Sequence, residues 1–170
     1  AAREFIIDIT ETIANMVVDR LHIIGDIFDR GPKSHVVLDY LMANRGVDIQ
    51  WGNHDIVWMG AATGNWGCIT NVLRMNISYN NFDMMETGYG INLRVLASFA
   101  QNVYGDDPCG FFKPKIFREN EFAPVDPDLA AKMHKAIAIC QFKVEGLTIK
   151  GHPDYKLEHR LLLDKIDYEK

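Results

Sequence analysis

The chain has 170 residues, of which 48% are hydrophobic and 24% charged, and its formal net charge is −5. These values are typical of one globular domain with its own core, and they argue against a basic, nucleic-acid-binding surface. No apolar run approaches the roughly 20 residues of a membrane span, and no signal segment opens the chain. The three cysteines, Cys68, Cys109 and Cys140, form no CxxC pair, so we expect reduced thiols and a cytoplasmic protein.

The first part of the chain alternates between helical and strand patterns. Residues 3–18 carry apolar side chains at helical spacing and predict a helix that packs on a sheet. Two short apolar runs, Leu21–Ile24 and Val47–Trp51, predict buried strands. Between them Ser34–Arg45 predicts a helix, with Ser34 as its N-cap. This order is typical of an α/β fold with parallel strands, in which the turns after both strands lie at one edge of the sheet.

The pattern becomes helical after residue 55. Ile56–Tyr79 and Ile91–Tyr104 predict helices that are separated by a loop, Asn80–Gly90. The stretch Gly105–Pro127 is irregular. It precedes a long helix from Pro127 to about Gly146, for which Asp126 and Pro127 form a suitable start.

Several aromatic and imidazole side chains have a structural as well as a functional interpretation. Trp51, Trp58 and Trp66 are more typical of core packing than of a substrate platform. His35 and His134 lie on predicted helices, where we expect solvated side chains.

Two polar motifs follow the two predicted strands. Residues 25–31 read GDIFDRG and residues 52–55 read GNHD. Carboxylate, amide and imidazole groups together suit Mn²⁺, Fe or Zn better than Mg²⁺ alone, and a guanidinium beside them indicates a phosphate-bearing substrate. Gly-Asp and Gly-Asn are also ordinary turn dipeptides, but two such motifs after neighbouring strands favour a metal-dependent phosphoryl hydrolase. The candidate site residues are Asp26, Asp29, Arg30, Asn53 and His54.

These motifs resemble the GDxxDRG and GNH(D/E) blocks of the calcineurin-like metallophosphoesterases. Longer runs, HIIGDIFDRGP, VDIQWGNHDIVWMGAA and YNNFDMMETGYGINLR, resemble the bacterial class III fructose-1,6-bisphosphatases from about residue 18 to residue 170. The resemblance implies an α/β fold in which a metallophosphoesterase-type β-sheet core is flanked by helices. It also implies a helical insertion at about residues 58–104 within a single, partial domain that spans residues 1–170.

The resemblance implies a role for each motif residue. Asp26 and Asn53 would be metal ligands, for two Mn²⁺ ions, and Asn53 would also touch the substrate phosphate. His54 would be the general acid, Asp29 would hold it in orientation and favour its charged form, and Arg30 would bind the phosphoryl oxygens. The nucleophile would be a hydroxide, because the cations lower the pKa of water.

The metal site that the resemblance implies is incomplete in this chain. The family begins with an Asp-x-His block, and nothing before Asp26 matches it. Two later metal-binding histidines are also expected, and we assign the nearest candidate, His152, to a loop. The chain therefore resembles an internal piece of a longer protein that carries half of a metal site.

The activity that the resemblance implies is the gluconeogenic hydrolysis of fructose 1,6-bisphosphate to fructose 6-phosphate and phosphate. A bisphosphate needs further cations for the phosphate that is not cleaved. Arg74 or Arg94 could serve, although simple solvation explains both arginines as well. A Ser/Thr phosphoprotein phosphatase, a nucleotide hydrolase and a catalytically silent fragment remain alternatives. We expect a small-molecule sugar bisphosphate as partner, without nucleic acid or membrane, and the sequence leaves a homo-oligomer open.

Overall fold

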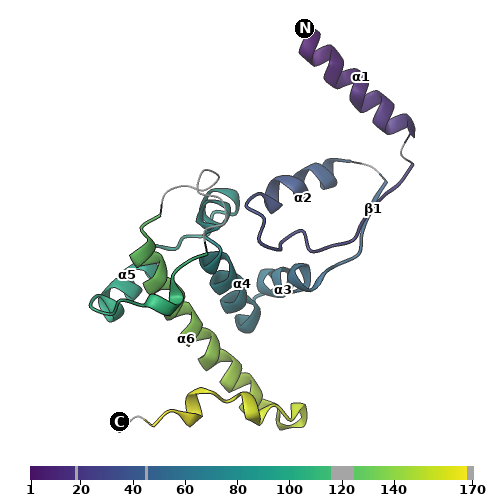
Figure 1. Cartoon of the computed structure of the whole chain (residues 1–170). Helices are drawn as coiled ribbons and strands as arrows, with labels where there is room; N and C mark the ends of the chain where they lie inside the picture. The colour runs from purple at the N-terminus through teal and green to yellow at the C-terminus, as the bar shows by residue number, and fades with distance from the viewer. Residues whose placement is uncertain (18, 45, 116–124, 168–170) are drawn as a thin grey trace.

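The computed structural model describes residues 1–17, 19–44, 46–115 and 125–167. Most of this chain is helical (Figure 1). The α-helices are α1 (Ala2–Val17), α2 (Ser34–Ala43), α3 (Asn53–Ala62), α4 (Trp66–Ser78), α5 (Arg94–Tyr104) and α6 (Pro127–Gly151). The strands are β1 (Leu21–Ile23) and β2 (Val47–Ile49). Short helical turns complete the fold: η1 (Met84–Gly88), η2 (Gly110–Phe112), η3 (Pro153–Tyr155), η4 (Glu158–Arg160) and η5 (Leu163–Lys165).

The two strands form a parallel sheet, with Leu21 opposite Val47 and Ile23 opposite Ile49. Helix α2 connects them, which confirms the predicted strand–helix–strand order and the α/β class. The prediction that the strands are buried is wrong, since neither contains a fully buried residue. Within the described residues the sheet has two strands of three residues each, so its faces remain largely uncovered, and a larger β-sheet core is not seen.

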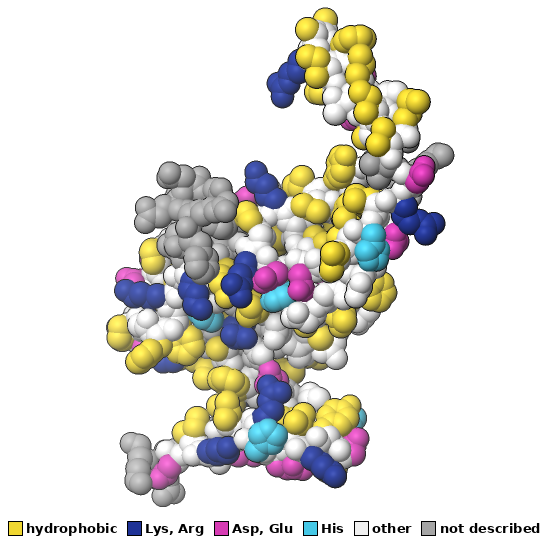
Figure 2. Space-filling view, turned by 45° about the vertical axis from the view of Figure 1, so that its right-hand side comes forward, with side chains coloured by type: hydrophobic (Ala, Val, Ile, Leu, Met, Phe, Trp, Pro, Cys, Tyr) yellow, Lys and Arg dark blue, Asp and Glu magenta, His cyan; other side chains and the backbone are white. Residues whose placement is uncertain are grey.

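Helix α1 forms where the apolar spacing predicts it, but it does not pack on the sheet. It projects away from the other elements (Figure 1), and apolar side chains cover much of its visible surface (Figure 2). Phe5 and Ile6, which were expected to face a sheet, are each 64% exposed. The amphipathic pattern therefore predicted the helix correctly, while the short two-stranded sheet offers no broad face to receive it.

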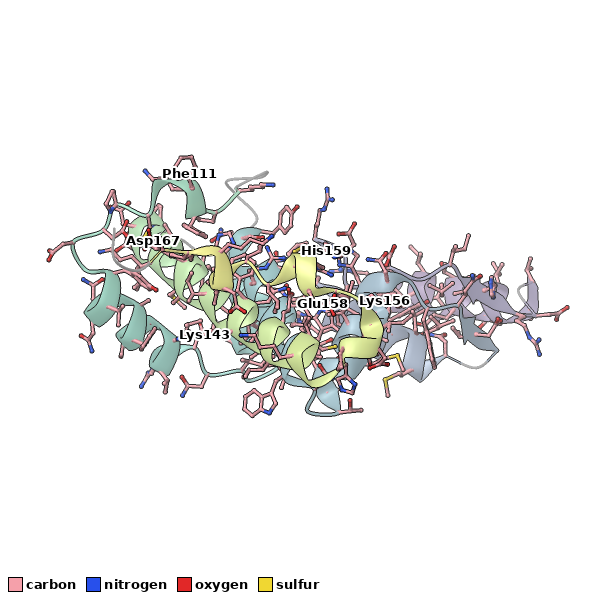
Figure 3. The ribbon with its side chains drawn as sticks, turned by 90° about the horizontal axis from the view of Figure 1, so that it is seen from below. Phe111, Lys143, Lys156, Glu158, His159 and Asp167 are labelled. Carbon is pink, nitrogen blue, oxygen red and sulfur yellow. The ribbon has the colours of Figure 1, made fainter. Side chains whose placement is uncertain are left out.

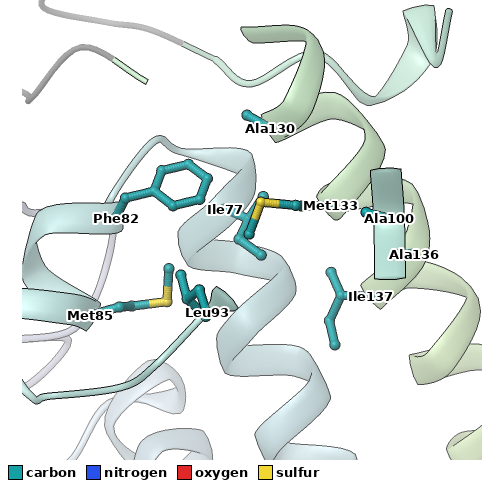
Figure 4. Close-up of a cluster of buried hydrophobic side chains, with 9 residues drawn as sticks. All are labelled: Ile77, Phe82, Met85, Leu93, Ala100, Ala130, Met133, Ala136 and Ile137. Carbon is teal, nitrogen blue, oxygen red and sulfur yellow. The ribbon is translucent and has the colours of Figure 1, made fainter. Parts of the chain in front are cut away.

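The hydrophobic core lies between α4, α5 and α6 rather than on the sheet. Ile77 and Met85 are completely buried, and Met133 and Ile137 of α6 face them (Figure 4). Burial of apolar surface is the main favourable term in folding, so this three-helix contact is the stable centre of the described chain. Residues 58–104 are helical, as predicted, and their interpretation as an insertion stays a prediction.

Helix α6 begins as its sequence predicts. The carboxylate of Asp126 accepts a hydrogen bond from the backbone N–H of Asp128 at 2.9 Å, and Pro127 occupies the first turn. The helix continues past the predicted end at Gly146 to Gly151, because Ile149 is buried and holds the additional turn.

The segment after α6 turns back and runs along that helix through η3, η4 and η5 (Figure 3). Lys150 pairs with Asp164 at 2.8 Å and ties the segment to the helix. Phe111 of η2, labelled in Figure 3, is fully exposed. Residues 116–124 of the predicted irregular stretch lie outside the described residues.

Three further local predictions differ from the structure. Ser34 is the first residue of α2 and not its N-cap, since its buried hydroxyl donates to the sulfur of Met84 at 2.8 Å. The predicted loop at Asn80–Gly90 contains the π-helical turn η1. Trp51 is 58% exposed and Trp66 is 71% exposed, so neither packs in a core.

The two histidines that were expected to be solvated are partly buried. His35 contacts the ring of Tyr89 edge-on, with centroids 5.9 Å apart. His134 lies with Nδ1 2.9 Å from the carbonyl oxygen of Phe112. Burial lowers the pKa of His134, although its contact with that carbonyl opposes the change. In the part of the chain that the structure describes, no helix is both long enough and apolar enough to cross a membrane.

Replacement of Ile77 tests the position of the core. Ile77→Ala removes a completely buried side chain between α4 and α6, so we expect unfolding free energy to fall by about 2–5 kcal/mol. Val95→Ala on the exposed face of α5 is the control, with an expected change within about 0.5 kcal/mol. Urea denaturation of the chain measures both values, and equal losses would contradict a core at this place.

Candidate active site

The turns that follow β1 and β2 touch each other through their backbones. A Cβ atom on Gly25 would lie 2.4 Å from the carbonyl oxygen of Gln50, and one on Gly52 would lie 2.1 Å from Oδ1 of Asp26. Gly25 also has a φ of 80°, which other residues rarely adopt. Glycine is therefore required at the start of both motifs, because a side chain at either place would separate the turns.

A buried carboxylate joins the two turns. Asp55 is 5% exposed, and its Oδ2 accepts hydrogen bonds from the backbone N–H of Asp26 at 2.7 Å and of Gly52 at 2.9 Å. Its Oδ1 accepts a third, from the N–H of Phe28 at 3.3 Å. Sequence analysis assigned no role to Asp55. The signal was present, because an acidic residue three positions after the residue that caps a helix often bonds back to that residue.

The predicted metal ligands lie where α3 begins. Oδ1 of Asp26 accepts a hydrogen bond from the backbone N–H of His54 at 3.1 Å, in the first turn of the helix. Asn53 is the first residue of α3. A helix start carries partial positive charge, which stabilises a carboxylate beside it. The turns thus bring Asp26 and Asn53 to one edge of the sheet, as the strand order predicted.

The described residues supply only part of a metal site. Among them, no group of three or more His, Cys, Asp or Glu side chains is arranged to hold a metal ion. Asp26 and Asn53 provide oxygen donors of the kind that Mn²⁺ accepts, so the chemistry of these two residues fits the ion. A tight site needs further ligands in addition to this pair.

Asp29 contacts two other candidate residues. Its Oδ1 lies 3.3 Å from Nε2 of His54 and 3.2 Å from Nε of Arg30. That oxygen is shielded from solvent and, among the described residues, has no partner in hydrogen-bonding geometry. These are therefore ion-pair contacts in which a carboxylate lies between an imidazole and a guanidinium. The structure brings Asp29, Arg30 and His54 together, and their catalytic roles stay predictions.

The turn that ends α4 holds Arg30 from the other side. The guanidinium carbon of Arg30 lies 5.3 Å from the centre of the Tyr79 ring, within cation–π range. The side-chain amide of Asn81 donates to the backbone carbonyl of Arg30 at 3.4 Å. The backbone φ is 55° at Arg30 and 61° at Asn80, so both segments turn sharply where they meet.

A small pocket opens beside Arg30 and His54. Amide and phenol groups form much of its polar lining, and Asn81 is buried with its Oδ1 unpaired within the described residues. The structure gathers several side-chain amides of the helical segment around the pocket. The polar residues that line it on the helical side are Asn71, Asn76, Tyr79 and Asn81.

The two arginines that were expected to bind the second phosphate do not line this pocket. Nε of Arg74 donates to Oε1 of Gln141 on α6 at 2.5 Å, so its guanidinium is engaged between two helices. Arg94 is exposed at the start of α5, on a different part of the helical segment. Neither arginine is therefore among the residues that line this pocket, and a role for them in binding phosphate stays a prediction.

An aromatic cluster attaches the first motif to the helical segment. Phe28 stacks on Trp58 with ring centres 4.5 Å apart, and Trp58 lies 5.1 Å from Tyr89. Burial raises the pKa of Tyr89, although its contact with Ser34 opposes the change. Among the three tryptophans, Trp58 alone is in the packed position that was predicted for all of them. The cluster positions the GDIFDRG turn next to α3.

Comparison with known proteins identifies the family. The model of the Firmicute fructose-1,6-bisphosphatase family matches residues 1–170, and the chain belongs to that family. Proteins named fructose-1,6-bisphosphatase class 3 are similar to it: 55% identical over 168 residues in Clostridium acetobutylicum, 56% over 169 residues in Clostridium novyi and 53% over 168 residues in Clostridioides difficile. Each match covers 99% of the chain and 25% of the relative, so the chain spans about a quarter of their length. No solved structure was found to match the chain.

Replacement of Asp55 tests whether its carboxylate joins the turns. Asp55→Ala leaves three backbone N–H groups without their acceptor, so we expect stability to fall by roughly 2–5 kcal/mol. Asp48→Ala on β2 is the matched control, since that carboxylate is half exposed and pairs only with His22 in the described chain. We expect it to cost less than about 1 kcal/mol. Equal effects in denaturation experiments would show that Asp55 has no special role.

Proposed function

We propose that the protein to which this chain belongs is a metal-dependent phosphatase that hydrolyses fructose 1,6-bisphosphate to fructose 6-phosphate and phosphate in gluconeogenesis. The observation that carries the proposal is the contact of Asp29 with both His54 and Arg30. It places an acid–base group next to an anion-binding group, which is the pair that phosphate-ester hydrolysis needs. The names of the relatives support the sugar substrate.

Each candidate site residue then has a defined part in the reaction. Arg30 binds the phosphoryl oxygens, because its planar guanidinium matches a phosphate in two hydrogen bonds. His54 gives a proton to the oxygen of the leaving sugar, which would otherwise depart as a poor, charged alkoxide. Asp29, whose Oδ1 lies 3.3 Å from Nε2 of His54, holds this imidazole in orientation.

Asp26 and Asn53 would hold divalent cations, which we propose to be two Mn²⁺ ions, at the start of α3. When bound, such cations neutralise phosphate charge and lower the pKa of the attacking water. Because the described residues provide too few ligands, we expect the 170-residue chain alone to be inactive and the complete protein to be active. The three free cysteines support a reducing, cytoplasmic location.

Phosphate release with and without metal tests the proposed activity. We expect the complete protein to release phosphate from fructose 1,6-bisphosphate when Mn²⁺ is supplied and to lose this activity after chelation. A phosphopeptide and a nucleotide serve as comparison substrates in the same assay. A higher kcat/KM on either would replace the sugar assignment, and metal-independent turnover would overturn the metal assignment.

Substitution of His54 tests the proposed general acid. His54→Asn should lower kcat of the complete protein by roughly 10²–10⁴-fold, since general acid catalysis contributes about that much. Metal content, measured by elemental analysis, should not change. His159→Asn is a matched control in the exposed η4 turn and should keep full activity. An unchanged rate in His54→Asn would remove this residue from the mechanism.

A further inference from the structure

Two cations lie against the ring of one tyrosine beside the candidate active site. The guanidinium carbon of Arg30 is 5.3 Å from the centre of the Tyr79 ring, and Nζ of Lys115 is 5.5 Å from the same centre. The two positive groups are therefore no further apart than the sum of these distances. Lys115 belongs to the stretch that was predicted to be irregular, 85 positions from Arg30 along the chain.

Lys115 is held in this position through its backbone. Its N–H donates to the carbonyl oxygen of Ser78 at 2.8 Å, at the end of α4 and next to Tyr79. The side chain is exposed, and in the described ranges no carboxylate lies within ion-pair distance of it. Other lysines of the chain differ, since Lys135 pairs with Asp107 and Lys150 pairs with Asp164. Lys115 is thus a fixed cation that is available to a ligand.

The surroundings of Lys115 are positive as well. The pKa of His134 is lowered mainly by burial, and the charges of Arg74 and Lys115 add to this effect. Both cations are therefore near enough to His134 to act on it. An anion that binds here would relieve the mutual repulsion of these groups.

We infer that Lys115 binds the phosphate of a sugar bisphosphate that is not cleaved, while Arg30 binds the phosphate that is cleaved. The ring of Tyr79 contacts both cations, so it holds them near each other and limits the spacing between the two phosphate positions. Lys115 takes the part that the sequence suggested for Arg74 or Arg94. This inference rests on the proposed function and adds the group that would distinguish a bisphosphate from a monophosphate.

Kinetics of the complete protein on two substrates test the inference. Lys115→Gln should lower kcat/KM for fructose 1,6-bisphosphate by roughly 10- to 100-fold, mainly through KM, since a contact with a charged group is being lost. Turnover of fructose 1-phosphate, which has no second phosphate, should stay unchanged. Lys115→Arg should retain most of the wild-type preference for the bisphosphate, because it keeps the charge.

Product inhibition provides a second, independent measurement. Fructose 6-phosphate carries only the phosphate that is not cleaved, so Lys115→Gln should weaken its inhibition and leave inhibition by inorganic phosphate unchanged. Lys113→Gln is the matched control, since this lysine is exposed in the same loop, two positions before Lys115. It should behave as the wild type in both measurements.

The outcomes separate this inference from the proposed function. Equal losses on both substrates, or no loss on either, would overturn the role of Lys115 while the wild type still hydrolysed the bisphosphate. If Lys113→Gln lowered kcat/KM for fructose 1,6-bisphosphate by the same factor, the cause would be the general charge of the loop. That result would also overturn the role of Lys115. Absence of wild-type activity on fructose 1,6-bisphosphate would overturn the proposed function and the inference together.

Discussion

The candidate site depends on one buried carboxylate. Asp55 accepts hydrogen bonds from three backbone N–H groups in two turns, whose nearest bonded residues, Phe28 and Gly52, are 24 positions apart in sequence. Hydrogen bonds to charged groups are worth about 1.5–3 kcal/mol each, more than most neutral ones. Because Gly25 and Gly52 leave no space for a side chain, the turns are held at contact distance. The positions of all other motif residues follow from this junction.

The helical segment completes the site without being part of either motif. Its core of α4, α5 and α6 is the most deeply buried part of the described chain, and the turn at the end of α4 extends from it. That turn contacts Arg30 through Tyr79 and Asn81. The anion-binding group therefore lies between a small sheet, which carries the motifs, and a packed helical unit, which restrains its side chain.

Sequence patterns predicted local structure well and predicted packing less well. The strand–helix–strand order, the start of α6 at Asp126 and the helices of residues 58–104 all follow from local signals such as apolar spacing and helix caps. The exposure of Trp66 and of α1 could not be predicted from such signals. An apolar pattern shows that a surface is suited to burial, but it does not show whether a partner surface is present. For the same reason His134 could not be recognised as partly buried.

By itself the sequence determined the chemistry of the two motifs, their place after neighbouring parallel strands and the family to which the chain belongs. Only the tertiary structure decided that Asp55 joins the turns, that Arg74 bonds to Gln141, and that Lys115 and Arg30 contact the same ring. The physical reason is the distance along the sequence over which each kind of interaction acts. Helix caps and strand periods act over a few residues, whereas these contacts join segments that are brought together only when the helices pack.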